Sequence, residues 1–233
     1  SSYNFTYVFD LQNSNRTKFY SKYLLSKTQW SSTNTALETH QKKSDFDEEP
    51  ILKRMEIQLK KSGIKTLNVQ KANLNWATVN IRNITKNYFN RKYILIFPFC
   101  SLKHVKKKWP YFRILISQLK SKYNRKYDIV IAPGPKEINE ANLLNAHTIL
   151  DGNESLRIDQ LISLIKDASF IIANDTGPAH ICSHMNKAGI VLFGAHTSAH
   201  KVSIETDKFK AISVKDLNLL KADVVMNEIK KVL

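Results

Sequence analysis

The polar residues best placed for chemistry gather on one turn of the chain, at Asp175, Thr176 and His180. The turn follows an apolar run, which predicts a buried parallel strand, and precedes a stretch with helical character. The N–H groups at the N-terminus of such a helix can hold phosphate, and open α/β sheets bind ligands at this edge. A simple helix cap between two strands explains the same spacing equally well.

The local sequence predicts the elements that position this turn. Phe170–Ala173 and Ile190–Phe193 are unbroken apolar runs, typical of strands that are buried on both faces. Gly177 permits a tight turn, and Pro178 suits the first turn of a helix, where its missing N–H leaves no bond unmade. We therefore expect a short helix over about Ala179–Lys187 between the two strands.

The segment DTGPAH at residues 175–180, followed by a short helix and an apolar strand that ends in Phe-Gly, resembles a family signature. The family is the heptosyltransferases of glycosyltransferase family 9. Its members transfer a heptose from an ADP-sugar to the inner core of lipopolysaccharide. The resemblance implies a two-domain GT-B fold whose C-terminal domain binds the nucleotide sugar.

The alternation of strands and helices after residue 92 predicts an α/β fold with a doubly wound parallel sheet. The expected strands are Tyr93–Phe97, Tyr127–Ala132, His147–Leu150 and a weak one at Phe209–Ser213. The expected helices are Tyr111–Lys122, Lys136–Leu144, Leu156–Lys166 and a last one over Asp216–Leu233. We place this C-terminal nucleotide-sugar-binding domain at residues 87–233.

Residues 1–86 predict a smaller, partial N-terminal domain of Rossmann-like character. Tyr7–Asp10 reads as a strand, and Ser14 or Asn15 caps a helix that runs to Leu25. The polar stretch Gln29–Glu49 predicts a long loop, and a second helix runs from Pro50 to Gly63. The resemblance implies that this part is the later portion of an acceptor-side domain.

The family's opening strands, with a glycine-aspartate loop whose aspartate acts as general base, have no counterpart in this chain. The chain does not begin with Met, so we expect either a piece of a longer protein or a processed chain. Two hypotheses therefore stand: a glycosyltransferase, or a non-catalytic nucleotide-sugar-binding module or inactive fragment. The catalytic base itself is not assigned.

The formal net charge of +16 at pH 7 favours a polyanionic partner, although a solvated lysine-rich surface explains it about as well. We expect an anionic glycolipid acceptor and peripheral contact with an anionic membrane surface. A nucleic acid is not an expected partner, because the sequence lacks the zinc-finger, aromatic RNA-binding and basic heptad patterns of proteins that recognise nucleic acids.

The location predicted from the sequence is the cytoplasm, with the inner face of the inner membrane as the place of peripheral contact. The chain has neither an apolar run long enough to span a bilayer nor a signal-peptide pattern at its start. Its two cysteines, Cys100 and Cys182, lie in or beside apolar runs and are expected to be reduced core residues.

The resemblance implies roles for residues after two earlier strands. In the family, a hydroxyl residue and a lysine before Trp-Pro contact the donor phosphates, and these positions fall on Ser101 and Lys108. A glutamate that contacts the ribose falls on Glu137, and a carboxylate can accept two hydrogen bonds from a ribose diol. Taken alone, Lys108 belongs to a lysine run typical of a solvated surface, and the helix dipole explains Glu137 equally well.

In the turn at residues 175–177, we expect the Thr176 hydroxyl and the N–H groups near Gly177 to contact phosphate. We expect Asp175 to accept hydrogen bonds from sugar hydroxyls, because a diphosphate would repel its carboxylate. His180 either binds phosphate or is a buried histidine whose hydrogen bonds are satisfied inside the protein. His196 and His200, which flank the loop after Gly194, are both in sequence position to close over the donor.

On the acceptor side, Asp10, Gln12 and Arg16 lie where the first strand ends and the first helix begins. Arg16 suits a phosphate or carboxylate of an acidic acceptor, and surface capping and solvation explain each residue equally simply.

We expect no metal and no cofactor, because no cluster of His, Cys and carboxylate positions has the spacing of metal ligands. Lysine and N–H groups can instead stabilise the charge that gathers on the leaving diphosphate of an ADP-sugar.

Overall fold

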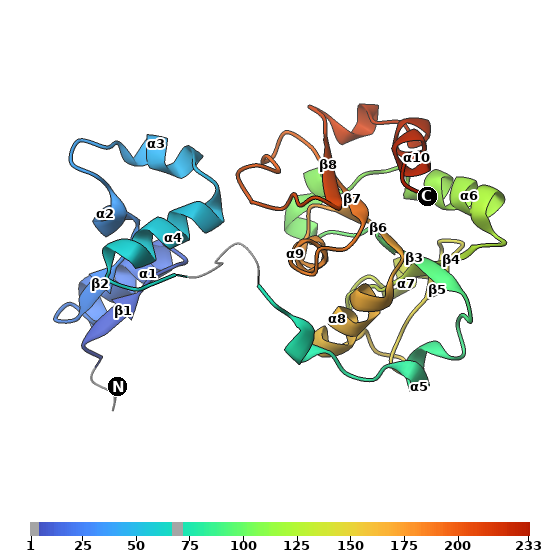
Figure 1. Ribbon diagram of the computed structural model, residues 1–233, viewed down its shortest axis with the longest axis horizontal. Helices are drawn as coiled ribbons and strands as arrows, with labels where there is room; N and C mark the ends of the chain where they lie inside the picture. Colours follow the sequence, from blue (N-terminus) through green and yellow to red (C-terminus); the bar gives the residue numbers. More distant parts are fainter. Residues whose placement is uncertain (1–4, 67–71) are drawn as a thin grey trace. The chain divides into compact units, whose positions relative to one another are not determined.

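The computed structural model describes residues 5–66 and 72–233 (Figure 1). The chain divides into two compact units, which are described separately. Unit 1 comprises Ser1–Lys71 together with His200–Ser203, and unit 2 comprises Ala72–Ala199 and Ile204–Leu233. Each unit contains a parallel sheet, so the α/β class predicted from the sequence is confirmed.

Unit 1 is built on a small strand–helix–strand motif. Strand β1 (Tyr7–Phe9) pairs in parallel with β2 (Gln29–Ser31), with Tyr7 opposite Gln29. The connection consists of α1 (Asn15–Phe19) and a π-helical turn, η1 (Tyr20–Leu24). Ser14 caps α1 by accepting a hydrogen bond from the Thr17 N–H. This motif is the partial Rossmann-like domain that the sequence predicts.

The prediction of a long loop over residues 29–49 is wrong. The segment contains β2 and two short helices, α2 (Thr33–Ala36) and α3 (Lys43–Glu48). Each helix buries a single apolar side chain, Ala36 or Phe46, so the segment lacks the repeated apolar spacing that marks a helix in a sequence. The predicted helix that follows is present as α4 (Ile51–Lys61).

Unit 2 contains a six-stranded parallel sheet in the order β5-β4-β3-β6-β7-β8. Its strands are β3 (Lys92–Phe97), β4 (Tyr127–Ile131), β5 (His147–Thr148), β6 (Phe170–Asn174), β7 (Gly189–Phe193) and β8 (Phe209–Ser213). The chain winds from β3 outward to β5, then returns to the other side of β3 and winds outward again from β6 to β8. The winding direction reverses between β3 and β6, and such a switch point is where open α/β sheets form a ligand crevice.

Helices cover both faces of this sheet. On one face α6 (Phe112–Tyr123) and α10 (Ala222–Lys230) lie side by side (Figure 1) and share a core with Ile94 and Ile96 of β3. On the other face Tyr93 donates a hydrogen bond to the Leu164 carbonyl of α8 (Ile158–Asp167). Successive residues of a strand point to opposite faces, which explains why the strands are unbroken apolar runs.

Residues 72–86 group with unit 2, whereas the sequence analysis placed them in the first domain. They form a short 3₁₀ turn, η2 (Asn75–Ala77), and a short helix, α5 (Arg82–Thr85). The Val79 N–H donates a hydrogen bond of 2.8 Å to Ser163 Oγ of α8, which fastens this segment to the second unit. The polar composition of the segment does not reveal this attachment.

The remaining helices of unit 2 are short. They are η3 (Leu102–Lys107), α7 (Ile138–Ala141), α9 (Gly177–His184) and η4 (Leu217–Leu219). The single last helix predicted over Asp216–Leu233 is therefore two elements, η4 and α10. No helix in the described part of the chain is long and apolar enough to cross a membrane.

Replacement of Gly189 by alanine is expected to destabilise unit 2. A Cβ there would lie 2.4 Å from the Ile171 carbonyl oxygen and 2.8 Å from the Phe209 ring, so neighbouring strands would have to move. We expect the free energy of unfolding in urea to fall by about 1–3 kcal/mol. Gly177→Ala is the matched control, because a Cβ at Gly177 meets no atom within 4 Å. Equal losses in the two variants would contradict this explanation.

Candidate functional site

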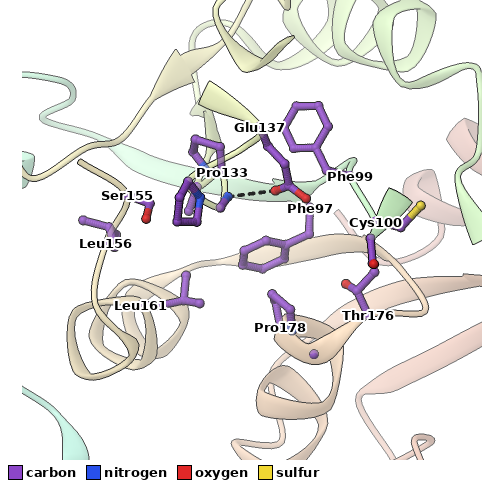
Figure 2. Close-up of a pocket in the computed structure, with 15 residues that line it drawn as sticks. Phe97, Phe99, Cys100, Pro133, Glu137, Ser155, Leu156, Leu161, Thr176 and Pro178 are labelled. Atoms are coloured by element: carbon purple, nitrogen blue, oxygen red, sulfur yellow. Dashed lines mark hydrogen bonds between the residues drawn. The ribbon is translucent and has the colours of Figure 1, made fainter. Parts of the chain in front are cut away.

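A cavity of about 370 Å³ lies at the carboxyl edge of the sheet in unit 2, at the switch point between β3 and β6 (Figure 2). Its walls are formed by the segments after β3, β4 and β6, by the start of α9, and by residues just before and within α8. Its apolar lining includes Phe97, Phe99, Pro133, Leu156, Leu161 and Pro178. Its polar lining includes Ser101, Glu137, Ser155 and Thr176. This size and mixture suit a small organic ligand with a few polar groups.

The buried side chain of Asn174 fixes the geometry of this edge. Its Nδ2 donates to the Pro98 carbonyl at 2.8 Å, and its Oδ1 accepts from the Trp109 N–H at 3.1 Å. Trp109 is itself buried and donates from its indole N–H to the Leu220 carbonyl at 2.7 Å. Asn174 thus ties the end of β6 to both ends of the loop after β3. Sequence reasoning passed over Asn174, although an amide at the end of a buried strand is a recognisable signal.

Four of the residues singled out from the sequence meet in this cavity: Ser101, Glu137, Thr176 and Gly177. Glu137 lies at the start of α7, and its Oε2 accepts a hydrogen bond of 2.8 Å from the Gly134 N–H (Figure 2). This bond holds one carboxylate oxygen against the loop after β4.

The two residues that begin α9 leave its N-terminus open to the cavity. Thr176 is the N-cap, yet its side chain makes no capping hydrogen bond, and its Oγ1 lies 3.4 Å from the Asn174 carbonyl. Gly177 has no side chain to cover the backbone, and a Cβ would meet no protein atom within 4 Å. The helix therefore presents N–H groups and a hydroxyl beside an open space, which suits an anion.

Next to the cavity, three basic side chains surround the carboxylate of Asp175. It is 2% exposed, and its Oδ2 accepts from Lys107 Nζ at 2.6 Å. The same oxygen lies 2.9 Å from His196 Nε2, and Oδ1 lies 3.7 Å from His180 Nε2. We call Lys107, Asp175, His180 and His196 the Asp175 cluster. Three of the residues weighed in the sequence, Asp175, His180 and His196, are thereby brought together.

The two lysines at the end of η3 point to different carboxylates. Lys107 pairs with Asp175, while Lys108 pairs with Glu140 and lies 5.7 Å from the centre of the Phe99 ring. The sequence analysis chose Lys108 because it precedes Trp109, and nothing in the lysine run distinguishes Lys107. Among the residues that the structure describes, Lys108, Asp175 and His180 stand outside the cavity lining.

Burial shifts the pKa of three groups at or near the site. It lowers the pKa of His180 below its usual 6.5, although the nearby Asp175 charge opposes the shift, and it also lowers the pKa of His184 in the last turn of α9. Burial raises the pKa of the Cys100 thiol, which lines the cavity. Both cysteines are free thiols, and Cys182 is fully buried.

The acceptor-side residues lie in unit 1. Asp10 is buried, and its Oδ1 accepts hydrogen bonds from the N–H groups of Gln12 and Asn13, so it shapes the turn after β1. Gln12 and Arg16 are exposed. Asp10 and Gln12 also line a second, largely apolar cavity of about 1050 Å³ in unit 1.

The family model for Glycosyltransferase family 9 (heptosyltransferase) matches residues 3–228. The chain belongs to glycosyltransferase family 9. The resemblance inferred from DTGPAH and the segments around it is confirmed, and the protein is a glycosyltransferase of the heptosyltransferase family. Comparison with curated proteins gives no significant match.

Solved structures show the family 9 fold directly. E. coli heptosyltransferase WaaC with ADP is 15% identical, with a TM-score of 0.66 over 99% of this chain and 74% of WaaC. WaaC with ADP-2-deoxy-2-fluoro heptose is 15% identical, with a TM-score of 0.65 over 99% and 73%. E. coli ADP-heptose lps heptosyltransferase II is 17% identical, with a TM-score of 0.65 over 97% and 75%. These neighbours establish the GT-B type of fold.

Within residues 5–66 and 72–233, no group of three or more His, Cys, Asp and Glu side chains could hold a metal ion. Charged groups at or beside the cavity of this family 9 protein include Glu137, the Asp175 cluster and the Lys108–Glu140 pair.

Asn174→Leu is expected to lower the free energy of unfolding by about 2–5 kcal/mol, because it leaves the buried Trp109 N–H and the Pro98 carbonyl without their partner. Urea titration measures the loss. Asn227→Leu, at an exposed position of α10, is the control and should leave stability nearly unchanged. A loss below 1 kcal/mol at Asn174 would show that the clamp does not hold this edge together.

Stability should also fall as the pH drops below about 6.5. The folded state keeps the pKa of His180 and His184 below the unfolded value of 6.5, so the unfolded state binds more protons in this range. Urea titrations at pH 7.5 and 5.5 (roughly one unit on either side) measure the effect. His180→Gln should reduce the loss, whereas His147→Gln, at an exposed position of β5, should not. An equal loss in wild type and His180→Gln would contradict this origin.

Proposed function

We propose that unit 2 binds an ADP-sugar in the cavity at the switch point, and that the protein transfers a heptose or related sugar from it to a lipopolysaccharide-core acceptor. The observation that carries the proposal is the meeting of Ser101, Glu137, Thr176 and Gly177 around one cavity. Membership in glycosyltransferase family 9 supports it, as do the WaaC structures, which are described with ADP and with an ADP-heptose analogue.

The two ends of the cavity suit the two ends of a nucleoside diphosphate. The apolar side chains of Pro133, Leu156 and Leu161 provide a surface for a base. Glu137 keeps one carboxylate oxygen on the Gly134 N–H, so its other oxygen can accept from a ribose hydroxyl. We assign the base and ribose to this side.

The diphosphate then falls beside Ser101, Thr176 and the N-terminus of α9. Hydroxyl and N–H donors there face a group that gains negative charge as the glycosidic bond breaks, which is the arrangement that stabilises a leaving diphosphate. Lys107 and Lys108, at the end of η3, supply the positive charge. We therefore propose transfer without a metal ion, with lysine in that role.

Asp175 is assigned to the sugar. Lys107 and His196 hold its carboxylate beside Thr176. The sugar is bonded to the β-phosphate, so its hydroxyls would reach Asp175 there. An ammonium group has three donors, so Lys107 can contact this carboxylate and a phosphate oxygen together. Because of this contact, we extend the phosphate role from Lys108 to both lysines.

The acceptor proposal rests on charge. The net charge of +16 suits an anionic glycolipid and peripheral contact with the anionic inner face of a membrane. Asp10, Gln12 and Arg16 of unit 1 are the proposed acceptor-side residues, with Arg16 exposed for a phosphate or carboxylate.

A non-catalytic nucleotide-sugar-binding module is the second candidate. The polar residues around the cavity support it, because they account for donor binding and no catalytic base is assigned among them. The two candidates differ in turnover and share the donor site.

Calorimetric titration with ADP, and with UDP and GDP as controls, tests the donor site. We expect selective binding of ADP, weakened by about 1–3 kcal/mol in Lys107→Ala and in Lys108→Ala, because each removes a charged hydrogen bond to phosphate. Lys106→Ala, an exposed neighbour in η3, is the matched control and should bind as wild type does. Binding of no nucleotide, or unchanged affinity in both variants, would refute the donor site.

Release of ADP from ADP-heptose in the presence of deacylated lipopolysaccharide core then separates the two candidates. Acceptor-dependent release that persists in EDTA supports metal-independent transfer. ADP binding without any release supports the binding module, and release abolished by EDTA contradicts the assignment of the positive charge to lysine.

A further inference from the structure

The most heavily occupied atom at the site is Asp175 Oδ2, which contacts both Lys107 Nζ at 2.6 Å and His196 Nε2 at 2.9 Å. The two partners differ in the conformational freedom of their side chains. Lys107 reaches the carboxylate on a flexible four-carbon side chain from a short 3₁₀ turn. His196 approaches it from the loop after β7 with a rigid ring that is only 14% exposed.

Packing fixes the position of the His196 ring. The ring stacks on Phe193, the last residue of β7, with centres 6.0 Å apart and planes 13° apart. Gly194 makes room for it, because a Cβ there would lie 3.3 Å from His196 Nδ1 and 3.4 Å from Leu217 Cγ. The ring is therefore held by contacts that do not involve Asp175.

The hydrogen-bonding pattern identifies the proton that His196 contributes. A carboxylate only accepts, so Nε2 carries the hydrogen that points to Oδ2. Nδ1 is buried and has no hydrogen-bond partner among the described residues. The tautomer with its hydrogen on Nε2 leaves only a lone pair unpaired at Nδ1, whereas the other one would bury an unpaired N–H.

We propose that His196 is a positioning residue for the donor sugar. It keeps the Asp175 carboxylate in place when the Lys107 ammonium also contacts the diphosphate. An ammonium shared between the carboxylate and the leaving group binds each of them less tightly than it would bind one alone, and the His196 N–H makes up for this at Asp175. This inference rests on the proposed function, because it takes the diphosphate to lie beside Lys107 and the sugar beside Asp175.

Affinities for ADP and for ADP-heptose, measured by calorimetry on the full chain, test the proposal. His196→Phe keeps the ring and its stacking on Phe193 but loses the N–H, and we expect it to bind ADP-heptose at least about tenfold more weakly. Its affinity for ADP, which has no sugar for Asp175 to contact, should be unchanged. His196→Gln restores an N–H at a similar distance and should recover most of the loss. His147→Phe, on β5, is the matched control and should bind as wild type does.

The outcomes separate this inference from the function on which it rests. If wild type binds neither ligand, the proposed donor site fails and the inference fails with it. If wild type binds both and His196→Phe matches it, the donor site stands and the positioning role is overturned. Equal weakening for both ligands, a lowered unfolding temperature, or no recovery in His196→Gln would assign His196 a purely structural role and also overturn the proposal.

Discussion

The site depends on the two hydrogen bonds of one buried amide. Where a parallel sheet reverses its winding, the connections leave in opposite directions, and the loops on either side of the crevice have no common support. Asn174 supplies that support, because an amide can donate to Pro98 and accept from Trp109 at the same time. The burial of Trp109 then fixes the end of η3, which carries Lys107 and Lys108. The segments after β3 and after β6, which form two sides of the cavity, are thus positioned from the last residue of β6.

The architecture of unit 2 could be predicted because strands β3, β4, β6 and β7 are buried on both faces and are therefore nearly continuous apolar runs. Phe209–Ser213 is only partly buried at the edge of the sheet, which makes it the weakest of the strands in the sequence, and it still forms β8. The segment at residues 29–49 could not be predicted in this way. Its helices are too short for a helical repeat, and each is fixed by one side chain, Ala36 or Phe46, whose burial depends on tertiary contacts.

The residues of the candidate site could likewise be predicted only in part. Residues that end strands or begin helices, such as Thr176 and Gly177, can be found from the sequence, because such residues lie at the edge of the sheet. The partners of Asp175 could not be assigned, since Lys107 and Lys108 are neighbours in a lysine run and their different directions follow from the fold of η3. The place of His196 likewise depends on its stacking against Phe193.

The composition of unit 1 bears on how the protein is made. Residues 200–203 belong to this unit, where the Ile51 N–H donates to the Lys201 carbonyl and Lys201 Nζ donates to Glu48. During synthesis the chain emerges from its N-terminus, and domains generally fold as they appear. Unit 1 cannot complete its folding before unit 2 is synthesised, because residues 200–203 are translated only after β3 to β7 of unit 2. The folding of the first unit is therefore completed only after most of the second unit has been synthesised.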